Sequence, residues 1–158
     1  MRRLLIVSLL TLLPGTAFAQ LDLNTAGQAT VVDFAGFTGA GFAASPAAGQ
    51  LDSDEWRITG LSVGTMNFGE DKTSNDFARG MSAGGVTTGG IYAFTVPNGS
   101  GTSTALGVQP GGTDFNPGTA TLRARNNTGS TVTSVDFSMR FCVLNNENRS
   151  SSLDVKYS

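Results

Sequence analysis

Side chains with oxygen ligands in two loops are the residues of this chain whose types and spacing could bind a metal ion. They are Asp52, Asp54 and Glu55 in the first loop, and Glu70, Asp71, Asn75 and Asp76 in the second. Calcium takes six to eight oxygen ligands, and carboxylate and amide oxygens suit it. Neither loop has the EF-hand spacing, which needs glycine at the sixth position and an acid at the twelfth. We therefore expect no obligatory cofactor, with calcium as the candidate ion and solvated loop acids as the alternative.

Paired acids are also the one enzymatic route that the composition leaves open. Glycoside cleavage can use two carboxylates about 5–5.5 Å or about 6.5–9.5 Å apart. The candidates are Glu55, Glu70, Asp71 and Glu147, and each lies in or beside a polar turn. A carboxylate-dependent polysaccharide-cleaving enzyme is thus a remote alternative, and no residue is assigned a catalytic role.

The sequence lacks the residues that other common catalytic systems need. The chain has 0 histidines and 1 cysteine, which excludes Ser-His-Asp and Cys-His nucleophiles and histidine or thiolate zinc sites. The glycine-rich stretches lack the GxxxxGK[ST] form of a phosphate-binding loop. We expect a protein that is not an enzyme.

A carbohydrate site would need exposed aromatic or polar side chains. The candidates are Trp56 and a polar loop with Asn145, Asn146, Glu147 and Arg149, whose amide and guanidinium groups could bond sugar hydroxyls. Trp56, Tyr92 and Tyr157 each occupy an alternating strand position beside apolar residues, which favours burial over a stacking platform. A polar hairpin turn is the alternative for the loop.

The N-terminus has the three parts of a secretory signal. Arg2 and Arg3 precede an apolar stretch at 4–13, and Ala17-Phe18-Ala19 places small residues at a cleavage site. The apolar stretch is near ten residues, whereas a membrane span needs about 20. We predict a signal peptide at 1–19, one domain at 20–158, a secreted or cell-surface location, and no membrane span after cleavage.

Charge and cysteine content narrow the partners. Without Arg2 and Arg3, 8 basic residues face 12 acidic ones, a net charge of −4. Nucleic-acid binders normally carry a basic patch, and here Arg123 and Arg125 alone cluster, on one strand face. We expect no nucleic-acid partner. The expected partner is an extracellular glycan or a surface protein. Cys142 has no partner for an intrachain disulfide, and we expect it to be a small buried apolar residue.

Period-two alternation predicts most of the strands. The clearest segments are 55–63, with an irregularity at Gly60, then 90–97, 103–108, 119–125, 135–143 and 153–157, and weaker candidates are 29–34 and 64–69. In the segment 135–143, Phe137, Met139 and Phe141 are expected to face the core. Turns rich in glycine, proline and asparagine, with no intervening helix, favour an all-β, antiparallel two-sheet sandwich that is jelly-roll-like.

Two glycine-rich stretches lack this alternation. Residues 34–50 are predicted to be an irregular loop that inserts Phe37 and Phe42 into the domain. Residues 70–88 are predicted to be a long surface loop, and long loops are often functional or mobile.

The C-terminal third also carries a resemblance. Residues 105–107 (ALG), 114–115 (DF), 126–129 (NNTG) and 146–150 (NENRS), with a weaker echo at 54–58, carry it. Over 105–158 the chain resembles a β-sandwich module that recurs in secreted and cell-surface proteins of bacteria, often with a C-terminal sorting region of the PEP-CTERM type. The resemblance implies fold and location, and no catalytic role.

One departure from that module affects the domain boundary. A "DG-x-x-F" segment and further sheet commonly follow the last strand, whereas here the sequence stops at Ser158. We expect the domain to be truncated at its C-terminus. The leading hypothesis is a non-catalytic extracellular module with a structural or adhesive role; the alternative is a carbohydrate-binding module, assisted by calcium.

Overall fold

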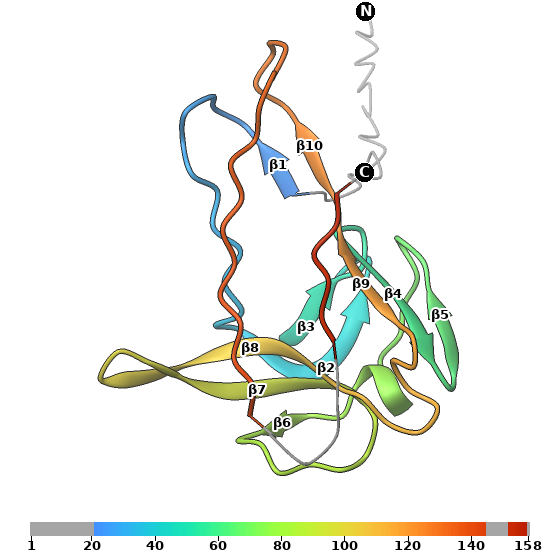
Figure 1. The fold of residues 1–158 in the computed structure, drawn as a ribbon. Coiled ribbons are helices and arrows are strands. Elements are labelled where there is room, and N and C mark those ends of the chain that lie inside the picture. The colour runs from blue at the N-terminus through green and yellow to red at the C-terminus, as the bar shows by residue number, and fades with distance from the viewer. Residues whose placement is uncertain (1–20, 145–151, 158) are drawn as a thin grey trace, which may run out of the picture.

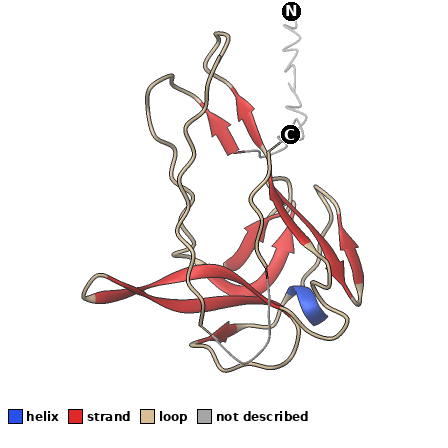
Figure 2. Cartoon of the chain, in the orientation of Figure 1, coloured by secondary structure: helices blue, strands red, loops and turns tan. Residues whose placement is uncertain are grey.

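The computed structural model describes residues 21–144 and 152–157 (Figure 1). Among these residues the structure is all-β, with one short 3-10 helix, η1 (Asn75–Phe77) (Figure 2). The strands in chain order are β1 (Leu21–Leu23), β2 (Phe37–Ala43), β3 (Gly49–Asp52), β4 (Trp56–Leu61), β5 (Gly64–Met66), β6 (Met81–Ser82), β7 (Gly90–Asn98), β8 (Gly101–Gln109), β9 (Thr119–Leu122) and β10 (Ala124–Asn126). The part of the chain that the structure describes has no helix long and apolar enough to cross a membrane.

The described strands form four small sheets. Two are parallel pairs, β1–β10 and β2–β3, and two have three strands, in the orders β5-β4-β9 and β6-β7-β8. The predicted all-β class is confirmed. The finer prediction of two sheets packed as a sandwich is not, because the strands divide into these smaller units.

The sheet β5-β4-β9 follows the sequence pattern closely. Trp56 and Ile58 alternate inward on β4, and Ile58 lies opposite Met66 of β5 and Ala120 of β9. The predicted irregularity at Gly60 is confirmed as a shift in the β4–β5 register. Gly60 has φ +83, and a Cβ there would overlap the Pro117 carbonyl, so glycine is needed for both reasons.

The β7–β8 hairpin is the longest paired element. Its register runs without a break from the pair Gly90–Gln109 to the pair Asn98–Gly101, with Gly99 at φ 60 in the two-residue loop. Both faces of β7 are apolar. Ile91 and Ala93 join the main core, while Tyr92, Phe94 and Val96 form a second cluster on the other face.

The main core lies between the hairpin and the strands β2 and β4. Its buried members are Phe37, Phe42, Trp56, Ile58, Leu61, Met66, Phe77, Ile91 and Ala93. The burial predicted for Phe37 and Phe42 is confirmed. The irregular loop predicted around them is wrong, because 37–43 and 49–52 pair as parallel strands across a bulge. The predicted long surface loop 70–88 is not wholly a surface loop. It contains the short strand β6 and the helix η1, whose Phe77 is buried.

Two predicted C-terminal strands and one N-terminal strand are absent from the described structure. Residues 29–34, 135–143 and 153–157 have no strand partner. Figure 1 shows the chain after β10 running back as an extended ribbon toward the β7–β8 hairpin. The expected inward direction of Phe137, Met139 and Phe141 is wrong, since their side chains are exposed.

Candidate functional site

Trp56, the aromatic candidate for a sugar platform, lies in the main core. The residue is 8% exposed, and the Phe34 ring packs against it at 6.0 Å between centroids. Tyr92 is also buried, and its hydroxyl donates to the Thr88 carbonyl at 3.0 Å. Tyr157 is fully exposed, so its expected burial is wrong. The rings of Trp56 and Tyr92 therefore offer no free face on which a sugar could stack.

The polar loop proposed for hydrogen bonding to sugars falls outside the described residues. Asn145, Asn146, Glu147 and Arg149 all belong to 145–151. The predicted signal peptide at 1–19 lies outside them as well. Both stay predictions.

The first group of candidate calcium ligands lies in the turn between β3 and β4. Asp52 caps this turn: its Oδ1 accepts the Asp54 N–H at 2.8 Å, and its carbonyl accepts the Glu55 N–H at 3.2 Å. Burial raises the pKa of the Asp52 carboxyl, and burial together with repulsion from Asp52 raises the pKa of Glu55. Asp54 is 3% exposed, and the buried Ser53 Oγ has no hydrogen-bond partner among the described residues. The turn is thus held by two local hydrogen bonds, one to the Asp52 side chain and one to its carbonyl.

The second group of acids is divided among separate contacts. The Glu70 carboxylate accepts the Asn67 backbone N–H at 2.9 Å and its side-chain amide at 3.1 Å, and these bonds lower the pKa of Glu70. Asp71 accepts the Ala44 N–H at 2.9 Å, and Asp76 points into the protein toward Arg79. In 21–144 and 152–157, no three acidic or cysteine side chains are placed to hold a metal ion together.

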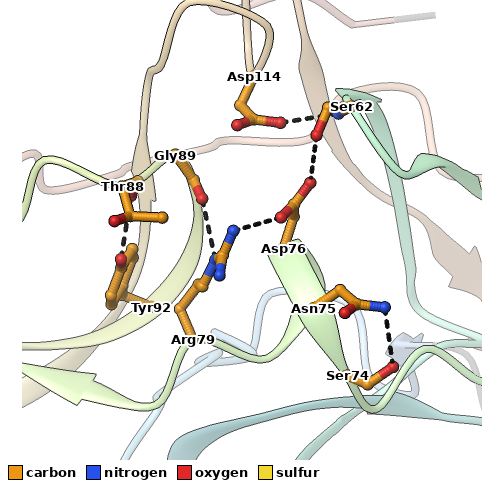
Figure 3. A network of polar contacts seen from close by, with 9 residues as sticks. All are labelled: Ser62, Ser74, Asn75, Asp76, Arg79, Thr88, Gly89, Tyr92 and Asp114. Atoms are coloured by element: carbon orange, nitrogen blue, oxygen red, sulfur yellow. Dashed lines mark hydrogen bonds and ion pairs between the residues drawn. The ribbon is translucent and has the colours of Figure 1, made fainter.

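Asp76 belongs to a buried polar network that Figure 3 shows. One of its carboxylate oxygens accepts the Ser62 hydroxyl at 2.7 Å, and the other is ion-paired with Arg79. Arg79 Nε also donates to the Gly89 carbonyl at 3.0 Å, and Asp114 accepts the Ser62 N–H at 2.7 Å. Asp76 and Asp114 are 4% and 7% exposed.

This network ties four loops together beneath the end of the β7–β8 hairpin. Each of the three charged side chains has a hydrogen-bond partner inside the network, which is what buried charge requires. Sequence reasoning singled out Asp76 as a calcium ligand and missed Arg79, Ser62 and Asp114. The spacing of Asp76 and Arg79 was the available signal, since opposite charges three residues apart often pair across a turn.

A hollow of about 470 Å³ lies beside β3. It is lined by Asp33, Phe34, Gly36, Phe37, residues 46–49, Gln50 and Leu51. Its polar groups serve the chain itself: Asp33 accepts the Ala35 N–H at 3.2 Å, and Gln50 accepts the Ala47 N–H at 2.8 Å. The hollow therefore presents no converging set of unused polar groups.

A row of exposed apolar side chains is unusual for the surface of a soluble protein, and we call it the exposed apolar row. This name denotes five alternating side chains: Val135, Phe137, Met139, Phe141 and Val143. They are 49–80% exposed. Leu153, Val155 and Tyr157 repeat the pattern and are also exposed.

The segment that carries the row is anchored near β7. Arg140 donates to Asn98 Oδ1 at 3.0 Å and to the Pro97 carbonyl. Leu144 packs on the second cluster with Tyr92, Phe94 and Val96. Cys142 is exposed, so its expected burial is wrong: the segment lies on the outside, where alternate positions have nothing packed over them.

Comparisons with known proteins give no family assignment, because no family model, curated protein or solved structure matches this chain.

Proposed function

We propose that this chain is a non-catalytic extracellular module of a secreted or surface-displayed bacterial protein, with a structural or adhesive role exerted through the exposed apolar row. The single observation that carries this proposal is that row of five apolar side chains, 49–80% exposed. Soluble monomers rarely expose contiguous apolar patches above a few hundred Å², and larger ones mark interaction surfaces.

The composition of the row supports contact with another surface. Phe137 and Phe141 are 64% and 51% exposed. A phenylalanine can bury about 150–250 Å² in an interface. Aromatic residues and methionine are enriched at interface cores. A row with two phenylalanines and a methionine is therefore suited to adhesion.

The extracellular setting is part of the proposal. The signal-like sequence at 1–19, the low share of charged residues (14%) and the many turn residues support it. The resemblance over 105–158 points to the same setting, and the lack of histidine supports the non-catalytic part of the proposal.

We also propose a two-sheet, jelly-roll-like sandwich as the architecture of the covered state. In that state, 135–143 and 153–157 become paired strands. Two observations support this: both segments keep strict alternation, and β7 already carries apolar side chains on both faces.

Adhesion measurements on the full exported chain test the function. Beads coated with the protein are applied to an alkyl-terminated surface and to a hydroxyl-terminated one. We expect retention on the alkyl surface, reduced at least several-fold by the double substitution Phe137→Ser with Phe141→Ser. The matched control is Val31→Ser with Met81→Ser, which removes exposed apolar side chains elsewhere (77% and 58% exposed) and should leave retention unchanged.

Three results would overturn the proposal. The first is retention that is the same for both double variants. The second is saturable, calcium-dependent binding on a glycan array, which would identify a carbohydrate-binding module instead. The third is release of reducing sugar that is abolished by Glu55→Gln or Glu147→Gln.

A further inference from the structure

We infer that the exposed apolar row pairs with the same segment of a second copy of this chain, as two antiparallel strands centred on Ser138. This inference rests on the proposed function and names the partner of its surface. The segment is extended and has no strand partner among the described residues, so its backbone groups are available to a ladder. Unpaired strands are templates for pairing with another chain.

The apolar face limits the registers that the pair can adopt. In an antiparallel ladder, residues directly opposite each other lie on the same face of the sheet. The row occupies odd-numbered positions only. Registers that set odd positions opposite odd positions keep both rows on one face, and a slip by one residue would set the row against polar side chains.

Charge selects one of the remaining registers. Centring the pair on Ser138 sets Asp136 of each copy opposite Arg140 of the other, which gives two reciprocal ion pairs on the polar face. On the apolar face it sets Val135 opposite Phe141 and Phe137 opposite Met139. Opposite charges across a ladder and aromatic–aliphatic pairs both favour pairing.

The neighbouring symmetric registers lose this complementarity. Centring on Met139 sets Asp136 opposite Cys142 and Arg140 opposite Ser138. Centring on Asp136 or on Arg140 sets two like charges directly opposite each other, which is unfavourable. Centring on Phe137 leaves Arg140 opposite Ser134 and Asp136 opposite Ser138.

Both charged side chains are available for this pairing. Asp136 is exposed and has no ion-pair or hydrogen-bond partner within 21–144 and 152–157. Arg140 uses one terminal nitrogen on Asn98 and the other on the Pro97 carbonyl. A guanidinium carries five N–H donors, so Arg140 retains donors for a carboxylate of the second copy.

The ribbon can be widened by the second apolar segment. An isolated two-stranded ribbon is marginal in water, whereas three or more strands with an apolar face are not. Leu153, Val155 and Tyr157 of each copy provide one further alternating strand on either side. The paired state then has four strands, two from each chain.

A charge-complementation experiment tests the register. The full chain and its Asp136→Arg and Arg140→Asp variants are compared by analytical ultracentrifugation at low salt. Each variant alone sets like charges opposite each other, so we expect its self-association to weaken about 10- to 100-fold relative to wild type. An equimolar mixture of the two variants restores opposite charges in both pairs and should associate within about three-fold of wild type. The restoration should fade near 1 M salt, where screening is strong.

Cysteine cross-linking gives a second readout of the same register. In a Cys142→Ala background, Ser138→Cys places two thiols across the two-fold axis, and mild oxidation should give a covalent dimer. Met139→Cys in the same background is the control, because position 139 then lies opposite 137 and should cross-link poorly. Directly opposite Cβ atoms are about 4.5–5.5 Å apart, while diagonal neighbours are about 7–8 Å apart.

A monomeric wild type, two single variants that do not complement each other, or preferred cross-linking through position 139 would each overturn the inference. Those results leave the proposed function standing if beads still adhere through Phe137 and Phe141. Loss of the proposed function is distinct, because the adhesion assay presents a surface that contains no second copy of the chain.

Discussion

Three glutamate and aspartate side chains near β3, β4 and β5 have pKa values moved in opposite directions by different causes. Burial raises the pKa of Asp52 and Glu55 in the turn before β4. Hydrogen bonds from Asn67 lower the pKa of the exposed Glu70. A raised carboxyl pKa contributes stability at low pH that is lost as the pH rises through the folded-state value; a lowered one contributes stability at higher pH that is lost as the pH falls.

Glutamine substitutions at positions 55 and 70 should therefore act in opposite directions at neutral pH. Glu55→Gln removes a half-buried charge that lies near Asp52, so we expect a higher urea midpoint at pH 7, with the advantage shrinking toward pH 3 as the wild-type carboxyl becomes protonated. Glu70→Gln replaces the carboxylate that accepts two hydrogen bonds from Asn67. We therefore expect a lower urea midpoint than wild type at pH 7, and a difference that shrinks at acid pH. Urea unfolding between pH 3 and 7 measures both. Midpoints shifted in the same direction at pH 7 would contradict this assignment.

At the scale of elements, strands with one apolar face and a marked turn were predictable from the sequence. The alternation of Trp56 and Ile58 located β4, and the Pro-Asn-Gly signal located the end of β7. The predicted irregularity at Gly60 coincides with its positive φ. In these strands the face that the local pattern predicts to be apolar is also the face that the rest of the fold covers. A strand can be predicted from sequence when these two agree.

The remaining elements were not predictable because long-range contacts decide them. Gly39 and Gly41 obscure the alternation of β2, and its pairing with β3 depends on positive φ values that a strand pattern does not contain. In the other direction, the alternation of residues 135–143 is as regular as that of β9, but no described strand lies beside them. An alternating pattern indicates which side chains share one face of a strand. It does not indicate whether another part of the protein covers that face. The candidate calcium ligands failed to gather for a related reason, since backbone N–H groups and Arg79 engage several of these acids individually.

Packing between β7 and β8 makes a prediction at this scale. Gly107 lies beside the Phe94 ring, and a Cβ at position 107 would overlap it. The φ of Gly107 is ordinary, so the effect of Gly107→Ala is steric alone, and we expect a loss of about 1–3 kcal/mol from overpacking. Urea unfolding measures this loss. The matched control is Gly112→Ala, where a Cβ would meet no atom within 4 Å and stability should be nearly unchanged. Equal stability of the two variants would show that the ring moves aside freely.

The whole molecule divides into a packed part and an open part. Residues from Phe37 to Leu122 supply the main core around β2, β4 and β7. Beyond β10, within 127–144 and 152–157, the chain contacts β7 through Leu144 and Arg140, and most of the apolar side chains there are exposed. Folding stability and the proposed surface function thus depend on different segments, so substitutions in one should leave the other intact.

This division predicts a contrast between two phenylalanines of the same size. Phe42 is fully buried, so Phe42→Ala should cost about 3–5 kcal/mol of unfolding free energy. Phe137 is 64% exposed, so Phe137→Ala should stay within about 0.5 kcal/mol of wild type at protein concentrations where the chain is monomeric. The same substitution should lower the stability at higher concentrations, because association stabilises the folded form by mass action and the row is its proposed contact surface. Urea unfolding at two protein concentrations separates these effects. A loss above about 2 kcal/mol for Phe137→Ala in the monomer would place its ring in the core after all, as the alternation of the sequence first indicated.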